Sequence, residues 1–243
     1  MNKVYLSVII PAYNEENRLN KTLEEADVYL KTQSYSYEIV VVNDGSKDNT
    51  AQLVEKAKLK IANLRLLDNQ ENHGKGFVVK QGMTEALGQY RLFSDADNSV
   101  SINQIEKIWP VLEQGYKVVI GSRTIKGAVI SPSQPWPRSL VGKTGNLMIQ
   151  TIGGLSGIWD SQCGFKCFTA DSAQNIFNKI TINRWGFDVE ALILAKKLGY
   201  QVKEIPVIWK NNIESKVRPS GIFKTLFEVL LIRWNLIINK YNL

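Results

Sequence analysis

The chain has 243 residues, enough for one large α/β domain or two small ones, and 44% of them are hydrophobic, which leaves ample material for a core. No uncharged apolar run of about 18 residues occurs, so we expect no transmembrane helix. The formal net charge of +7 is compatible with nucleic acid, a phosphorylated substrate or an anionic membrane surface, and it selects none of them.

Strand-like apolar runs alternate with helix-like stretches along most of the chain. This alternation predicts an α/β fold with a doubly wound, mostly parallel sheet and right-handed crossovers. The predicted strands are residues 6–10, 38–42, 64–67, 90–94, 117–120, 163–168 and 201–208. The predicted helices are residues 16–31, 50–60, 76–86, 102–113, 140–155, 173–177 and 187–198.

Two segments depart from this alternation. Residues 125–138 hold three prolines among glycine and serine, which predicts a long loop. We expect one domain over residues 1–210 and an extension over 211–243, whose helix either packs on its own domain or a dimer partner or lies in the plane of a membrane. Its apolar stripe consists of Phe223, Leu226, Phe227, Leu230, Trp234, Ile237, Ile238 and Tyr241.

The cysteine and histidine content argues against a zinc site. Cys163 and Cys167 lie in one segment, and His73 is the single histidine. We expect both cysteines to be reduced, in or near the core of a cytosolic protein. The first residues lead into a strand pattern without the features of a signal peptide.

Three predicted strands, residues 6–10, 38–42 and 90–94, end abruptly in polar residues. Asp95, Ala96 and Asp97 follow residues 90–94, and two carboxylates at a strand end suit a divalent cation that prefers oxygen ligands. Such a metal would bridge a diphosphate and neutralise a leaving group, whereas the alternative is an acidic turn that caps the next helix. Because open α/β sheets bind ligands at the carboxyl ends of their strands, the three ends together predict a nucleotide-sugar site.

Other candidate residues lie at further strand and helix ends. Asp44 could accept hydrogen bonds from a base or ribose, or form an Asx turn, and Lys75 lies between glycines at a helix start that suits a phosphate. Arg123 and Arg138 could each bind a phosphate through two hydrogen bonds or be solvated. Asp188 could cap its helix or act as a general base.

Motifs in both halves of the chain resemble one enzyme family. The segments 11–15, 42–46, 74–76, 95–97 and 121–123 resemble family-two inverting glycosyltransferases of the GT-A fold. The second half is similar to dolichyl-phosphate β-glucosyltransferases, relatives of the dolichyl-phosphate mannose synthases. That similarity rests on residues 160–166, 184–190, 206–209 and 215–217.

The resemblance implies a role for each matching residue. The nucleotide sugar would contact Pro11, Tyr13, Glu15, Asp44, Asp95 and Ala96. We add Lys75 to this set, because its place at a helix start suits a phosphate. The metal, Mg²⁺ or Mn²⁺, would bind Asp95 and Asp97. The acceptor phosphate would contact Arg123, Arg138, Ser215 and Lys216. The catalytic residues would be Asp97, Asp188 and Arg123. Ser99 stands where mannose synthases carry a glutamine ligand, so a third metal ligand is left open.

The sequence therefore predicts a metal-dependent inverting hexosyltransferase. It would move glucose from UDP-glucose, or as runner-up mannose from GDP-mannose, to a polyprenyl phosphate. That acceptor needs little help from a base, because its second pKa is about 6. We expect a cytoplasmic protein held peripherally at the inner face of the membrane, and we leave a homo-oligomer open.

Two rival functions remain. One is transfer to a sugar hydroxyl of a surface glycan, for which Asp188 would be an obligatory base. The other is a non-catalytic nucleotide-sugar-binding protein on the same fold. Nucleic-acid binding has no supporting motif.

Overall fold

The computed structural model describes residues 4–132, 136–210 and 220–243, without the side chains of residues 136–144 and 220–223. The strands of the main sheet are β1 (Leu6–Ala12), β2 (Tyr37–Asp44), β3 (Leu64–Asn69), β4 (Tyr90–Ser94), β5 (Val118–Ser122), β7 (Phe165–Thr169) and β8 (Val202–Pro206). A separate parallel pair consists of β6 (Val129–Ser131) and β9 (Ile208–Lys210). The helices are α1 (Leu19–Lys31), α2 (Thr50–Lys58), α3 (Lys75–Glu85), α4 (Trp109–Glu113), α5 (Trp136–Gly153), α6 (Ala170–Phe177), α7 (Phe187–Lys197) and α8 (Ser220–Ile237), with a 3₁₀ helix η1 (Ile102–Lys107).

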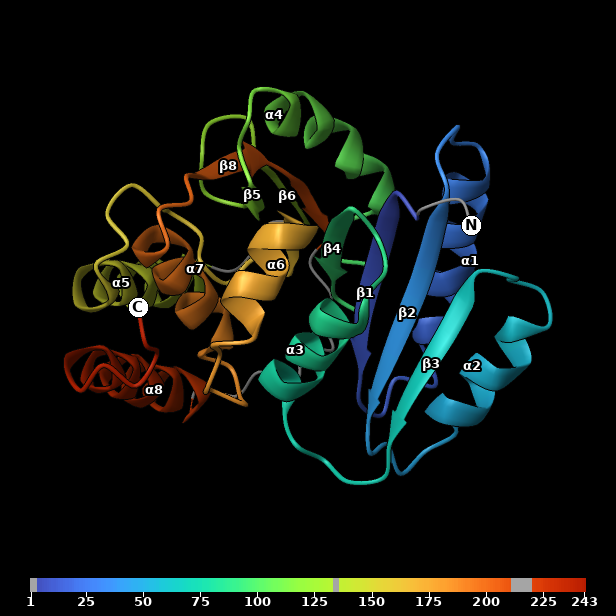
Figure 1. Ribbon diagram of the computed structural model, residues 1–243, viewed down its shortest axis with the longest axis horizontal. Helices are drawn as coiled ribbons and strands as arrows, with labels where there is room; N and C mark the ends of the chain where they lie inside the picture. Colours follow the sequence, from blue (N-terminus) through green and yellow to red (C-terminus); the bar gives the residue numbers. More distant parts are fainter. Residues whose placement is uncertain (1–3, 133–135, 211–219) are drawn as a thin grey trace.

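The seven-stranded sheet has the order β3-β2-β1-β4-β7-β5-β8, with helices on both faces (Figure 1). All seven residues of β1 are buried, and alternate residues enter different cores. Ile9 packs in a cluster with residues of α3, whereas Val8 and Ile10 pack in a cluster with residues of α1. Burial on both faces explains why this strand is an unbroken apolar run. The prediction of a mostly parallel α/β sheet is confirmed.

Strand β7 runs antiparallel between β4 and β5. Its second residue, Lys166, is paired in register with Phe93 on one side and Ile120 on the other. Because β7 is antiparallel, its first residue lies at the edge where β4 and β5 end. Residues 160–164, which precede β7, are thereby brought to the carboxyl ends of the parallel strands.

Four predicted element boundaries were wrong. The first helix begins at Leu19, because Glu15 and Glu16 hydrogen-bond to the loop before α2. Predicted helix 102–113 is divided into η1 and α4, where Pro110 follows the start of the second helix and cannot continue the first. Predicted loop 125–138 contains β6 and the first turn of α5. Predicted strand 201–208 is split at Val207, so that β8 joins the main sheet and β9 joins β6.

The C-terminal helix α8 packs beside α5 and α7 (Figure 1) and has two apolar faces. Val229 and Ile232 are fully buried in the core, and Tyr241 is buried beyond the end of the helix, so Tyr241 does not belong to an exposed stripe. The outward face carries exposed Phe227, Leu230, Trp234, Ile237 and Ile238. No helix in the described part of the chain is both long and apolar enough to cross a bilayer. The division at residue 210 stays a prediction.

Candidate active site

Asp44, the last residue of β2, ties that strand to the loop before α3. Its buried carboxylate accepts hydrogen bonds from Asn72 Nδ2 at 2.9 Å and from the backbone N–H groups of His73 at 2.8 Å and Gly74 at 3.0 Å. Burial raises the pKa of Asp44, although these backbone donors oppose the shift. The side chain that closes this turn is that of Asn43, whose Oδ1 accepts from the Ser46 backbone N–H at 3.3 Å and from the Ser46 hydroxyl at 2.5 Å. Contact of Asp44 with a nucleoside stays a prediction.

The end of β1 lies beside the end of β2, as the sequence suggested. Pro11 is buried within β1 and pairs in register with Val42, and Tyr13 follows with a partly exposed ring. Glu15 accepts two hydrogen bonds from the guanidinium of Arg18, each 2.8 Å long. The predicted nucleoside residues therefore share one sheet edge.

Lys75 opens α3 and points toward the end of β4. Its Nζ lies 2.6 Å from Asp95 Oδ1, 5.2 Å from the centre of the Phe93 ring and 5.3 Å from that of Trp185. Burial by itself would lower the pKa of Lys75, but Asp95 and Asp188 raise it above its ordinary value. A protonated amine thus lies against the first carboxylate of the predicted diphosphate site.

The Asp95-Ala96-Asp97 turn is fixed by contacts on both sides. The Asp95 carboxylate occupies the space beside Gly164, where an added Cβ would lie 1.9 Å from Asp95 Oδ2. Asp97 Oδ1 accepts the backbone N–H of Ser99 at 2.9 Å, and the Ala96 carbonyl accepts the Thr22 hydroxyl at 2.7 Å. Only a residue without a side chain at position 164 leaves room for this carboxylate.

The Asp95–Asp97 turn suits a magnesium or manganese ion shared with a diphosphate. Both side chains offer hard oxygen ligands, and about a third of the Asp95 side chain is exposed. Within residues 4–132, 136–210 and 220–243, no three acidic, cysteine or histidine side chains gather as a complete metal site. Mg²⁺ commonly takes one or two carboxylates and completes its shell with phosphate and water, and its binding by Asp95 and Asp97 stays a prediction.

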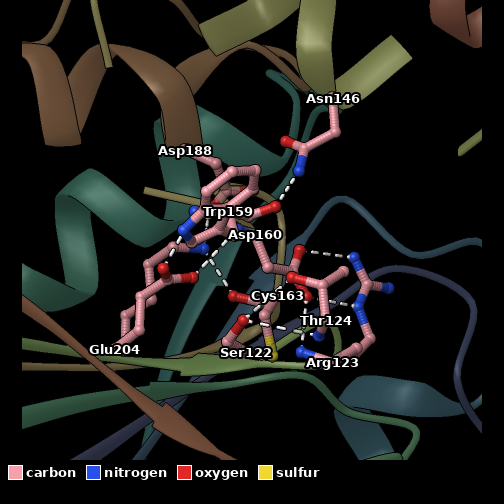
Figure 2. A network of polar contacts seen from close by, with 10 residues as sticks. Ser122, Arg123, Thr124, Asn146, Trp159, Asp160, Cys163, Asp188 and Glu204 are labelled. Atoms are coloured by element: carbon pink, nitrogen blue, oxygen red, sulfur yellow. Dashed lines mark hydrogen bonds and ion pairs between the residues drawn. The ribbon is translucent and has the colours of Figure 1, made fainter. Parts of the chain in front are cut away.

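On the other side of β4, Arg123 is held by Asp160 (Figure 2). The Asp160 carboxylate accepts from Arg123 Nε at 2.7 Å, from Nη2 at 2.8 Å and from the backbone N–H at 2.8 Å. The face of the guanidinium lies 5.6 Å from the ring centre of Trp209. Burial would raise the pKa of Asp160, but Arg123 holds it below its usual range. Arg123 is therefore present as a pre-oriented cation.

The other predicted acceptor residues are described only in part. Arg138 lies in the backbone of α5, and its side chain is outside the described part of the structure. Ser215 and Lys216 fall outside the described residues altogether. Their contact with an acceptor phosphate stays a prediction.

Asp188 is buried in an ion pair with Lys166. Lys166 Nζ lies 2.5 Å from Asp188 Oδ1 and donates to the Cys163 carbonyl at the same distance. Burial raises the pKa of Asp188, and Lys166 and Lys75 oppose that shift. Burial also raises the pKa of the Cys163 thiol to about 12, so this thiol stays protonated. Asp188 is thus paired within the protein, and its contact with an acceptor stays a prediction.

Sequence reasoning gave no role to Asp160, Lys166 and Trp185. The signal for Lys166 was available, because a lysine inside the apolar strand β7 needs a buried partner. Asp160 gave no such signal, since its partner Arg123 lies 37 positions earlier in the chain. Only the antiparallel insertion of β7 brings the two together.

The arrangement of carboxylates, lysine and arginine at one sheet edge is that of an enzyme acting on a nucleotide sugar. The family model for glycosyl transferase family 2 matches residues 7–169, which is more than half of the chain. The chain therefore belongs to glycosyltransferase family 2.

Characterised relatives extend the match along the whole chain. A dolichyl-phosphate beta-glucosyltransferase of Trichomonas vaginalis is 38% identical over 95% of this chain and 73% of its own length. Enzymes with the same name from Dictyostelium discoideum and Saccharomyces cerevisiae are 36% and 33% identical, over 100% and 99% of this chain and 78% and 77% of their own lengths. The resemblance found in the motifs is confirmed.

Solved structures share the fold at low sequence identity. Mannosyl-3-phosphoglycerate synthase from Rubrobacter xylanophilus superposes with a TM-score of 0.72 at 16% identity, covering 99% of this chain and 76% of that one. Glucosyl-3-phosphoglycerate synthase from Mycobacterium tuberculosis, in complex with Mn²⁺, UDP-glucose and phosphoglyceric acid, gives 0.65 at 15% identity, covering 94% and 78%. The predicted GT-A fold is confirmed.

Proposed function

We propose that this glycosyltransferase moves glucose from UDP-glucose to a dolichyl or other polyprenyl phosphate. The observation that carries the proposal is the division of one sheet edge into two charged halves. Lys75 pairs with Asp95 just after β4, and Arg123 pairs with Asp160 just after β5, with β7 between the two strands. The names of the relatives support glucose and dolichyl phosphate as the two partners.

On the donor side, this chain would bind and neutralise the leaving diphosphate. Asp95 and Asp97 would hold Mg²⁺ or Mn²⁺, which supplies charge to stabilise the departing nucleoside diphosphate. Lys75 would add a second positive charge from the start of α3, where a helix N-terminus also favours phosphate. A structural neighbour in complex with Mg²⁺ and uridine diphosphate supports this donor class.

On the acceptor side, the chain would orient an anion that is already a nucleophile. A phosphate monoester carries most of its second negative charge at neutral pH, so its attack on the sugar needs no strong base. Arg123 would bind this phosphate and place it behind the sugar carbon, opposite the leaving diphosphate. The burial of Asp188 against Lys166 supports transfer to phosphate over transfer to a hydroxyl, because a general base must reach its proton.

The membrane would supply the lipid acceptor to this face of the protein. Helix α8 exposes the apolar side chains Phe227, Leu230 and Trp234, and exposed Lys224 and Arg233 lie on the same helix. An amphipathic helix of this kind binds in the interface of a bilayer, where its basic residues contact anionic headgroups. We place the protein at the inner, cytoplasmic face of the membrane as a peripheral enzyme.

A direct assay tests the proposal. The protein is incubated with radiolabelled UDP-glucose, GDP-mannose or UDP-N-acetylglucosamine, a polyprenyl phosphate and Mg²⁺, and the lipid is extracted into organic solvent. We expect label in the organic phase from UDP-glucose, and loss of that label when EDTA is added. Label on a water-soluble glycan alone would instead establish the sugar-hydroxyl rival, and donor binding without any transfer or hydrolysis would establish the non-catalytic one.

A further inference from the structure

Glu204 holds two consecutive residues of the acceptor side through their backbone. It lies in β8, in register with Ile120 of β5. One of its carboxylate oxygens accepts the N–H of Asp160 and the other accepts the N–H of Trp159, each at 2.9 Å. Figure 2 shows Glu204 on one side of this dipeptide and Arg123 on the other. A single side chain thus fixes the Trp159–Asp160 backbone.

The inward side chain of this dipeptide aligns an arginine. Asp160 is almost fully buried and engages the Nε and Nη2 side of Arg123. The other edge of the Arg123 guanidinium is formed by Nη1 and the second hydrogen of Nη2. No hydrogen bond among the described residues uses this edge. A guanidinium has five N–H donors in a fixed plane, so this remaining edge can bind a second anion through two hydrogen bonds.

The other side chain of the dipeptide is presented to solvent. Trp159 is 56% exposed, although its backbone is held at both ends. Its N–H is bound by Glu204, and its carbonyl accepts from Asn146 Nδ2 of α5 (Figure 2). Leu147 and Met148, next to Asn146 in α5, are exposed as well. An exposed aromatic side chain therefore lies one residue away from the aspartate that aligns Arg123.

We propose that Glu204 is a positioning residue that sets both parts of the acceptor site. Through Asp160 it aligns Arg123 for the phosphate, and through Trp159 it places an aromatic ring against the isoprene units that follow the first ten carbons of the lipid. The inference rests on the proposed function, since it takes a prenyl phosphate as the acceptor. Trp159 and Asp160 are adjacent residues with Cα atoms about 3.8 Å apart, so a shift of their shared backbone moves both side chains.

The first test replaces the carboxylate by an amide. Gln in place of Glu204 retains one acceptor oxygen, so one of the two backbone N–H groups loses its partner. We expect Glu204→Gln to raise KM for polyprenyl phosphate about tenfold, the effect of losing one hydrogen bond to a charged acceptor. KM for UDP-glucose and kcat at saturating acceptor should remain within about twofold, since Glu204 touches neither substrate. Glu204→Asp, which keeps two acceptor oxygens, should recover part of the affinity.

Two further variants separate positioning from a general loss of structure. Trp159→Ala should raise KM for a long polyprenyl phosphate more than for a ten-carbon prenyl phosphate, whereas Asp160→Asn should raise both. The Glu204→Gln/Asp160→Asn double variant should bind the ten-carbon compound no more weakly than Asp160→Asn alone, because both changes act through Arg123. Exposed Glu85→Gln, at the far end of α3, is the matched control and should change none of these values.

The outcomes distinguish this inference from the proposed function. If wild-type protein transfers glucose to polyprenyl phosphate and folded Glu204→Gln has an unchanged acceptor KM, the positioning role is overturned and the function stands. Equal changes in donor and acceptor KM would overturn it too, since that pattern marks a structural role only. If wild-type protein neither binds nor glucosylates either prenyl phosphate, the proposed function fails and the inference fails with it.

Discussion

The proposed donor and acceptor halves of this site use charge in different ways. In the donor half, Lys75 and Asp95 form a pair in which both side chains remain partly exposed, at 21% and 32%. In the acceptor half, Lys166 and Asp188 are 2% and 5% exposed, and Asp160 is buried against Arg123. The first group can exchange its partners for a ligand, whereas most of the second group is committed to contacts within the protein.

This difference follows from the way each half is built. The donor half comes from successive strand-helix units, which end at one sheet edge and leave their terminal side chains accessible. The acceptor half depends on β7, which runs antiparallel and carries Lys166 into the core. A buried charge is stable only with a partner, and this half contains the ion pairs Lys166–Asp188 and Arg123–Asp160.

The largest expected effect is on the free energy of unfolding, when the buried Lys166–Asp188 ion pair is broken. Asp188→Asn leaves the Lys166 ammonium buried without a counter-ion, and we expect the free energy of unfolding to fall by about 3–5 kcal/mol. Urea unfolding measures this loss. Lys166→Met in the same background removes the unpaired charge and should restore most of the stability. Folded Asp188→Asn should still glucosylate polyprenyl phosphate.

The opposite result would change the role of Asp188. Near-total loss of transfer, with UDP-glucose binding and the fold preserved, would favour the sugar-hydroxyl rival. The buried charges of the acceptor half would then not be limited to contacts within the protein, because Asp188 would take part in the reaction.

In the donor half, we expect a substitution to change the free energy of unfolding little and the rate of sugar transfer strongly. Asp97→Asn should lower transfer by about 10²-fold or more, since it weakens the charge that stabilises the leaving diphosphate. Its melting temperature should stay close to that of wild type, because the amide oxygen of the substituted side chain can still accept the Ser99 N–H. Exposed Glu113→Gln is the control. Full activity in Asp97→Asn, with a normal melting curve, would refute the metal assignment.

The smallest effect concerns the exposed face of α8. We expect the protein to bind anionic vesicles and salt to weaken this binding, because each basic residue near the lipid surface contributes about 1 kcal/mol. Leu230→Glu with Trp234→Glu should abolish vesicle binding in a sedimentation assay while sparing UDP-glucose hydrolysis. Val229→Glu, on the buried face, should unfold the helix instead. Wild-type protein that ignores vesicles, or a double variant that unfolds or loses a dimer, would contradict the membrane role.

Helix α8 illustrates how far a pattern in the sequence can be interpreted. Helical spacing predicted an apolar stripe, but it could not tell the face that packs from the face that is exposed. The structure buries Val229, Ile232 and Tyr241, and exposes Phe227 and Trp234. Packing on its own domain is therefore confirmed for the buried face, whereas contact of the exposed face with a membrane stays a prediction, since an apolar helix side chain looks the same in a sequence whether protein or lipid covers it.

The sequence by itself determined the α/β class, the alternation of strands and helices, and the acidic turn after β4, because these depend on local periodicity and on residues close in the chain. It also placed Asp44, Lys75 and Asp95 at strand and helix ends, where a parallel sheet gathers them. Only the tertiary structure decided that Arg123 pairs with Asp160 and that Lys166 pairs with Asp188. Those pairs join residues far apart in sequence, and the antiparallel course of β7 that unites them depends on packing between β4 and β5, which no local pattern encodes.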